Sequence, residues 1–203
     1  MKPVILAAMR TSVLVLAIAT CLACGKPAKE PADGSAEKTT KSEFAPSGKT
    51  RAETVDGLVL TVPDDWQRAP SRSSMRKGEF VLTGAGGEAR LVVYRFEGGA
   101  GSAAQNIERW SSQMEPKGGD APKTNDLEVN GLRISSIEVA GRFAGQKMPG
   151  MPEQPPIDDA RLLAASIEGA GDPYYLKLVG PAATVDGWVP AWTEMLSKLA
   201  VAK

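Results

Sequence analysis

The 203-residue sequence predicts an α+β domain, in which a mostly antiparallel sheet carries helices packed on its faces. Three observations favour this class. From Val55 onward, short runs of apolar and β-branched residues recur with the length and spacing of strands. Turn signals join neighbouring runs into hairpins, and two segments repeat apolar residues at helical spacing. We therefore expect a single globular domain over residues 55–203.

The first half of this domain is predicted to begin with three strands. They are expected at Leu58–Val62, Met75–Thr83 and Glu88–Phe96. Pro63 closes the first strand, and the tight turn at Ala85–Gly87 joins the second and third into a hairpin.

A helix follows a glycine-rich loop. It is expected to begin after Ser102, because Gln105 stands three residues further on and completes a capping box. Ile107, Trp110 and Met114 recur at helical spacing, so we expect the helix to reach Met114 before Pro116 and Gly118-Gly119 end it.

The second half is predicted to hold two hairpins, whose turns are Asn130-Gly131 and Gly169–Asp172. Their strands are expected at Thr124–Val129, Leu132–Val139, Arg161–Glu168 and Tyr174–Val179.

The chain is predicted to end in a helix in which Pro190 marks a first turn or a kink. One face of this helix carries Trp188, Trp192, Leu196 and Leu199.

Residues 1–23 have the layout of an export signal peptide. Met1–Arg10 carries two positive charges, and Thr11–Ala23 is uncharged, mostly apolar and too short for a comfortable transmembrane span. The following string IATCLACG, at residues 18–25, resembles the lipobox of bacterial lipoproteins, which signal peptidase II cleaves. An ordinary cleaved signal or an uncleaved N-terminal anchor are the alternatives.

The lipobox resemblance implies that Cys24 becomes the acylated first residue, because the small Ala23 precedes it. Cys21 is the less favoured candidate, since the bulkier Thr20 stands before it. Palmitate-type chains would anchor the protein to the membrane of the cell envelope. Gly25 in place of an aspartate implies the outer membrane, facing the periplasm, if the host has two membranes.

Residues 24–54 are predicted to form a lipid-anchored flexible tether. Lys, Glu, Ala, Ser, Thr and Pro dominate this segment, and large apolar residues are nearly absent. Such a composition buries too little apolar surface to offset the entropy of ordering the chain.

The composition argues against several chemistries. The chain has no histidine, and its only cysteines are Cys21 and Cys24. The domain therefore has no imidazole for zinc or for activating a nucleophile, and no thiol chemistry. Without the leader, which holds Lys2 and Arg10, acidic residues outnumber basic ones by two. We expect no nucleic-acid partner, no cofactor and no metal site.

The long stretch Gly145–Asp159 is the candidate for a mobile partner-binding loop, with a solvated hairpin tip as the alternative. Its candidate residues are Lys147, Met148, Met151 and Glu153. The two methionines also suggest soft Cu(I) binding, although no histidine or cysteine completes the ligand set.

Other candidate sites are better explained as structure. Gly98–Gly101 precedes a helix, where backbone N–H groups can bind an anion, but it lacks the nucleotide-binding glycine patterns and is expected to form a turn. Trp110 is expected in the core with Arg109 at its edge. Core positions are also expected for Trp66, Trp188 and Trp192, and solvent-exposed turns for the carboxylate pairs Asp64-Asp65 and Asp158-Asp159.

The order of elements and several strings resemble the PsbP-like superfamily, an α/β/α sandwich with an antiparallel sheet. The strings are VPDDW at residues 62–66, the Gly-rich entry to a helix with Arg109-Trp110, and YYLKLVGP at residues 174–181. The resemblance implies a binding or accessory role, and it supplies no catalytic residue.

The sequence therefore favours an envelope lipoprotein of undetermined biochemical role, whose domain binds an envelope protein or small component rather than catalysing a reaction. A carboxylate- or Ser/Lys-based enzyme is the first alternative, and it predicts a concave site with convergent charged groups of shifted pKa. A Cu(I) chaperone acting through Met148 and Met151 is the second.

Overall fold

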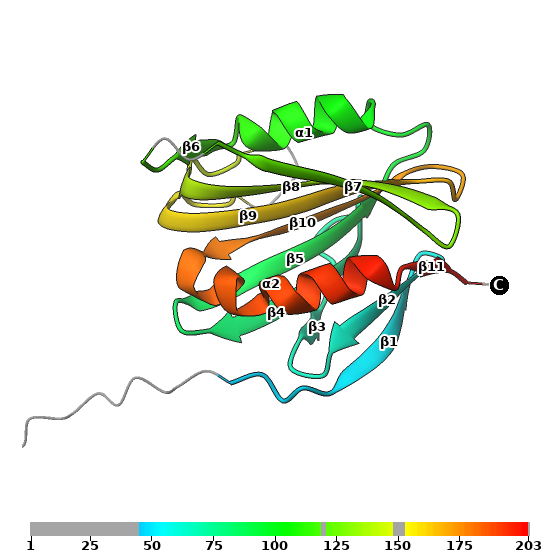
Figure 1. Ribbon diagram of the computed structural model, residues 1–203, viewed down its shortest axis with the longest axis horizontal. Coiled ribbons are helices and arrows are strands. Elements are labelled where there is room, and N and C mark those ends of the chain that lie inside the picture. Colours follow the sequence, from blue (N-terminus) through cyan, green and yellow to red (C-terminus); the bar gives the residue numbers. More distant parts are fainter. Residues whose placement is uncertain (1–44, 119–120, 148–152, 203) are drawn as a thin grey trace, which may run out of the picture. The chain divides into compact units, whose positions relative to one another are not determined.

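The computed structural model describes residues 45–118, 121–147 and 153–202, in which the chain forms eleven strands and two helices (Figure 1). Both candidate lipidation residues, Cys21 and Cys24, lie outside the described residues, as do Met148 and Met151. The elements are β1 (Thr50–Val55), β2 (Leu58–Pro63), β3 (Gln67–Ala69), β4 (Arg76–Gly84), β5 (Gly87–Arg95), α1 (Ala103–Ser111), β6 (Met114–Pro116), β7 (Lys123–Val129), β8 (Leu132–Phe143), β9 (Ile157–Glu168), β10 (Tyr174–Pro181), α2 (Ala182–Ser197) and β11 (Ala200–Val201).

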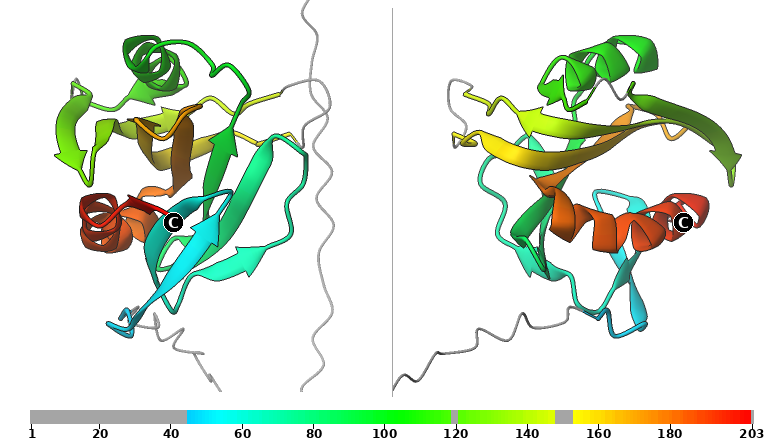
Figure 2. Two further views of the ribbon diagram at one scale, coloured as in Figure 1. Left: turned by 90° about the vertical axis from the view of Figure 1, so that its right-hand side faces the viewer. Right: turned by 60° about the vertical axis from the view of Figure 1, so that its left-hand side comes forward.

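The described residues form an α+β fold built on an antiparallel sheet of eight strands. Its order is β3-β4-β5-β10-β9-β8-β6. Strand β7 pairs with the first half of β8, and β6 pairs with the end of β8 along the same edge. A second sheet has the order β1-β2-β11. The two helices lie on opposite faces of the large sheet (Figures 1 and 2). The predicted fold class is therefore confirmed.

Two separate cores cover the two faces of the large sheet, because successive side chains of a strand point to opposite faces. The core on the α2 side contains three of the four tryptophans, Trp66, Trp188 and Trp192, and α2 packs there on β2, β4, β5, β9 and β10. The core on the α1 side contains Trp110, where α1 packs on β8 and β9. All four tryptophans are thus core residues, as predicted.

The predicted hairpin turns are present where the sequence places them. Val129 pairs with Leu132 across Asn130-Gly131, whose φ angles are 52° and 78°. Positive φ at both residues defines the type I′ turn that matches the twist of the flanking strands, and it explains the Asn-Gly pair. The β4–β5 hairpin turns just as tightly, since Gly84 pairs with Gly87.

The predicted domain boundary at residue 55 is wrong. Thr50–Val55 forms β1, which pairs with all of β2, and the backbone N–H of Ser47 donates to Asp65 Oδ2 at 3.1 Å. The composition of residues 50–55 gives little sign of this strand, because only Val55 is fully buried and its other side chains are exposed or half-buried. The turn that joins it to β2, Asp56-Gly57, has φ angles of 50° and 90° and is a hairpin signal in its own right.

The first helix is shorter than predicted. It begins at the predicted capping box of Ser102 and Gln105 but ends at Ser111. Met114 lies instead in β6, where it pairs with Phe143 and is buried on the α1 side. The helical spacing of Met114 therefore indicated burial correctly, although the chain there is extended.

The second helix also differs from its prediction in detail. Pro190 lies in the interior of α2, so of the two predicted alternatives, a first turn or a kink, the first turn is wrong. Leu199 is fully buried but follows the end of the helix, directly before β11. The short strands β3, β6 and β11, of two or three residues each, carry too little pattern to be read from the sequence.

Candidate ligand-binding site

The α1-side face of the large sheet places a lysine at its centre. Lys177 of β10 pairs with Val92 of β5 on one side and with Ala164 of β9 on the other. These residues belong to one row of cross-strand neighbours, which continues to Glu79 of β4 on one side and to Ile137 of β8 on the other. Helix α1 packs on β8 and β9, so it covers that end of the row. Lys177 lies next to the covered end and borders a hollow beside the helix.

This hollow, which we call the lysine pocket, is a partly enclosed cavity of about 200 Å³. Its walls are aromatic, its base holds Lys177, and the exposed Arg109 of α1 lies at its margin. The lining residues are Tyr94, Phe96, Ala100, Arg109, Trp110, Gln113, Gln146, Tyr175 and Lys177.

The aromatic walls are held by ring packing and by one hydroxyl. Tyr94 and Phe96 stack with ring centroids 6.0 Å apart and planes at 12°, and Phe96 lies 5.8 Å from Tyr175. The Tyr175 hydroxyl accepts a hydrogen bond from the Ala100 backbone N–H at 2.8 Å. The pocket is therefore shaped by β5, β10 and the loop that leads into α1.

The amino group of Lys177 is almost completely withdrawn from solvent, with 5% of the residue exposed. Nζ donates hydrogen bonds to Gln113 Oε1 at 2.6 Å and to Gln146 Oε1 at 3.1 Å, and it lies 4.9 Å from the centroid of the Phe143 ring. An ammonium group has three N–H donors. Two of them are used by the residues that the structure describes.

The surroundings of Lys177 disfavour its charge. Burial, and then the positive charges of Arg76 and Arg109, lower the pKa of Lys177 from 10.5 to about 8. A pKa of about 8 still leaves roughly ten protonated molecules for each neutral one at pH 7. No Asp or Glu of the described segments lies within 4.0 Å of its amino group. The pocket thus contains a buried cation, and the groups that contact its Nζ directly, two amide oxygens and a ring face, are neutral.

A neighbouring carboxylate is already engaged by arginines. Glu79 is fully buried, and its carboxylate lies 2.9 Å from Arg76, 3.0 Å from Arg90 and 3.5 Å from Arg72. A second carboxylate, Glu88, lies 3.4 Å from Arg90, so acidic and basic side chains are mixed at this end of the α1-side face. A second hollow of about 210 Å³, which we call the arginine hollow, opens beside it. Its lining includes the same three arginines, Phe143, and the carboxylates of Glu88 and Glu153.

The predicted loop 145–159 borders both hollows at its base. Gln146 and Gln154 exchange two backbone hydrogen bonds of 2.8 Å; Gln146 lines the lysine pocket, and Gln154 lines the arginine hollow. The predicted site residues Lys147 and Glu153 come together as an exposed ion pair of 3.5 Å. Neither of them lines the lysine pocket.

The glycine loop before α1 uses its backbone N–H groups internally. The Gly98 N–H donates to Asp172 Oδ1 at 3.0 Å, and the Gly99 N–H donates to the Phe96 carbonyl at 3.0 Å. The side chain of Asn106, which is completely buried, donates to the carbonyl of Ser102 at 2.8 Å. The loop is therefore a structural turn, as predicted.

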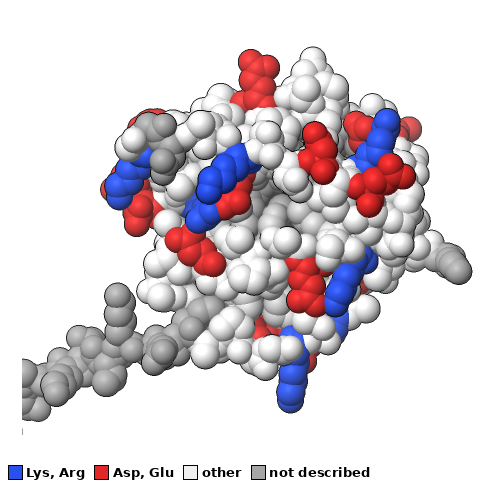
Figure 3. Space-filling model, viewed as in Figure 1, with Lys and Arg blue, Asp and Glu red and all other residues white. Residues whose placement is uncertain are grey.

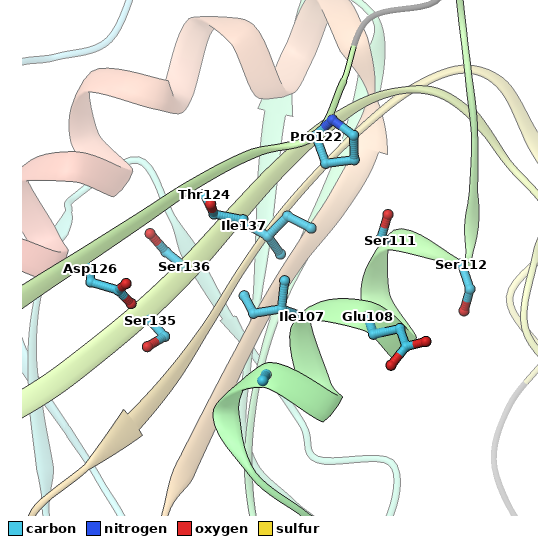
Figure 4. Close-up of a pocket in the computed structure, with 11 residues that line it drawn as sticks. Ile107, Glu108, Ser111, Ser112, Pro122, Thr124, Asp126, Ser135, Ser136 and Ile137 are labelled. Atoms are coloured by element: carbon cyan, nitrogen blue, oxygen red, sulfur yellow. The ribbon is translucent and has the colours of Figure 1, made fainter.

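A larger hollow, of about 620 Å³, lies between α1 and strands β7 and β8. Figure 4 shows that Ile107 and Ile137 face each other there, while the carboxylates of Glu108 and Asp126 lie on opposite sides. Its other lining groups are mainly hydroxyls, on Ser111, Ser112, Thr124, Ser135 and Ser136. This open groove holds no buried charge, so we place the candidate site in the lysine pocket.

The hydrogen bonds of Lys177 Nζ go to two glutamine side chains and not to a serine of the described residues. Ser166 is buried on the strand beside Lys177, yet its Oγ makes no hydrogen bond to any described group. Among residues 45–118, 121–147 and 153–202, no group of three or more Cys, Asp or Glu side chains could hold a metal ion.

The prediction of solvent-exposed turns holds only in part for the paired carboxylates. Asp158 and Asp159 are exposed but lie in β9, and Asp65 is half-buried and accepts hydrogen bonds from Ser47. Asp158 lies 3.1 Å from Arg142, and Asp159 lies 3.4 Å from Lys117. Over the face seen in Figure 1, Lys and Arg lie close to Asp and Glu, without a large area of one charge (Figure 3). In the part of the chain that the structure describes, neither helix is long and apolar enough to cross a membrane.

Sequence reasoning missed Lys177 as a site residue. Its signal is a single lysine inside the otherwise apolar and aromatic run Tyr174–Val179. Such a run in a central strand is buried on both faces, so its one charge must also be buried. The partners of that charge come from α1 and from the loop after β8, and no local pattern connects them with β10.

No protein-family model and no curated protein matches the sequence. Several solved structures have a similar fold, and three of them are described here. CyanoP, the cyanobacterial PsbP of Synechocystis sp. PCC 6803, has 13% identity and a TM-score of 0.47, covering 76% of this chain and 92% of its own. LpqN of Mycobacterium tuberculosis, which is involved in cell envelope biogenesis, has 12% identity and a TM-score of 0.45, covering 76% and 91%.

The third is PA94 of Pseudomonas aeruginosa, a protein of unknown function, with 19% identity and a TM-score of 0.42, covering 77% of this chain and 99% of its own. One of these structures is a PsbP, but its TM-score lies below 0.5, so the predicted resemblance to the PsbP-like superfamily stays a prediction. At such identities and scores, the comparisons assign no site residue to this chain.

Proposed function

We propose that this protein is a lipid-anchored binding module of the cell envelope, and that the lysine pocket is its ligand site. The observation that carries the binding role is the buried amino group of Lys177 in an aromatic, partly enclosed cavity. Ligand sites are concave and mostly apolar, with a few convergent polar groups, and the lysine pocket has this composition.

Lipid anchoring is supported by the lipobox resemblance at Cys24. Intact-mass and peptide mass spectrometry of the detergent-extracted protein should find the mature N-terminus at Cys24 with its acyl chains. We expect Cys24→Ser to remain unprocessed, whereas the matched variant Cys21→Ser should be acylated as in the wild type. Acylation of Cys21 would move the cleavage site, and an unmodified N-terminus would contradict the anchor.

The ligand site can be tested with a neutral probe that fits an aromatic pocket, 2-naphthamide. Trp110 lines the lysine pocket, whereas Trp66, Trp188 and Trp192 lie in the core across the sheet. Binding should therefore quench part of the tryptophan emission of the detergent-solubilised protein, and Trp110→Phe should abolish the quenching. Equal quenching in wild type and Trp110→Phe would contradict this site.

A further inference from the structure

We infer that the lysine pocket binds an organic monocarboxylate, with the carboxylate paired to the amino group of Lys177 and a flat apolar body against the aromatic walls. This inference rests on the proposed ligand site and names the class of its ligand.

The first step is the state of the buried charge. A buried ammonium is strongly disfavoured unless an opposite charge pairs with it. Two neutral amide oxygens and a ring face solvate Lys177, and Arg76 and Arg109 add repulsion. An anion entering the pocket would relieve this repulsion, so the site favours a negative ligand over a neutral one of the same shape.

The second step is the hydrogen-bonding capacity. Two of the three N–H donors of Lys177 are directed to Gln113 and Gln146. One donor and one charge are therefore left for the ligand, which matches a single carboxylate. The carboxylate of Glu79 does not occupy this role, because Arg76 and Arg90 hold both of its oxygens.

The third step is the size and shape of the cavity. Its volume of about 200 Å³ exceeds the roughly 150 Å³ of an apolar cavity that holds one benzene ring. Four aromatic rings, those of Tyr94, Phe96, Trp110 and Tyr175, line it. One ring, or two fused rings reaching toward the open side, can lie against these walls with the carboxylate at Lys177.

The test compares two probes of nearly the same shape, 2-naphthoate and neutral 2-naphthamide, by isothermal titration calorimetry at pH 7 on the detergent-solubilised protein. We expect the wild type to bind the naphthoate at least tenfold more tightly than the naphthamide. Lys177→Met should remove this preference while it keeps naphthamide binding. The control Lys198→Met, which changes an exposed lysine paired with Glu194 at the end of α2, should keep the preference.

Arg109→Gln gives a second variant that leaves the buried lysine in place. The exposed Arg109 adds positive charge at the margin of the pocket, so its loss should reduce the preference for naphthoate two- to fivefold. A ¹⁵N-lysine NMR titration should also show that naphthoate raises the pKa of Lys177, and that naphthamide does not.

The outcomes separate this inference from the proposed function. Equal binding of the two probes, or a preference that survives in Lys177→Met, would overturn the carboxylate ligand and leave the ligand site standing. If the wild type binds neither probe at millimolar concentration, the proposed site itself is wrong.

Discussion

At the scale of single residues, the buried cation is the feature that sets this domain apart from an ordinary packed core. Val92 and Ala164, the cross-strand neighbours of Lys177, are apolar and buried. A methionine at position 177 would fill the same space without the cost of burying a charge. A residue that lowers stability in this way is typical of a functional site.

We therefore predict that Lys177→Met stabilises the protein at pH 7. The pKa of Lys177 is about 8 in the folded state against a reference of 10.5. Below pH 8 both states are protonated, so the folded state carries the whole cost, roughly 3 kcal/mol for a shift of this size. Between pH 8 and 10.5 the unfolded state binds more protons, so wild-type stability rises with pH there.

Urea unfolding at pH 7 and pH 10 tests this prediction. The stabilisation by Lys177→Met should be about 1–3 kcal/mol at pH 7 and should shrink toward pH 10. Arg76, Glu79 and Arg109 face this region in both proteins, and burial raises the pKa of Tyr94, so the difference between variant and wild type isolates Lys177. A constant difference across the two pH values would contradict the burial of the charge.

At the scale of elements, one threonine connects the second helix to a hairpin that precedes it by about a hundred residues. The N-cap residue of α2 is Pro181, which makes no side-chain hydrogen bond. Thr184 Oγ1 instead accepts from the Gly86 N–H and donates to the Gly87 carbonyl, both at 2.9 Å. The packing is close, since a Cβ on Gly86 would lie 2.7 Å from Pro181.

Thr184→Val should remove both hydrogen bonds and leave the partly buried N–H of Gly86 without a partner. We expect a loss of about 2 kcal/mol in the free energy of unfolding, measured by urea titration. The matched control is Thr193→Val, because Thr193 is exposed on the same helix and bonds only to the Val189 carbonyl. Similar losses in both variants would contradict the linking role of Thr184.

The elements that the sequence predicts well are those with strong local signals. The hairpin at Asn130-Gly131 and the capping box at Ser102 depend on backbone geometry over four residues, so they are visible locally. The end of α1 is different. The chain leaves the helix because Met114 pairs with Phe143 of β8, and this long-range pairing overrides the helical spacing.

At the scale of the whole molecule, the first strand belongs to the folded domain. Val55 of β1 is buried in the core on the α2 side, and Arg51 donates to the carbonyls of Pro63 and Trp66 at 2.9 and 2.6 Å. A soluble fragment for binding studies must therefore begin before Ser47, whose backbone and hydroxyl both bond to Asp65.

We predict that a fragment starting at residue 45 unfolds at the same temperature as the mature protein. A fragment starting at residue 56 lacks β1, and it should lose at least roughly 3 kcal/mol, from one buried valine side chain and several backbone hydrogen bonds. Thermal unfolding followed by circular dichroism compares the three chains. Equal midpoints for both fragments would show that β1 adds no stability.

The sequence by itself determined the fold class, the hairpin turns and the core positions of the four tryptophans, because each depends on local pattern or hydrophobicity. It also supports the lipoprotein prediction, which lies outside the described residues. Only the tertiary structure decided the site. Lys177, Trp110 and Gln146 lie on three different elements, and they form one pocket because β10 is central in the sheet and α1 packs beside it.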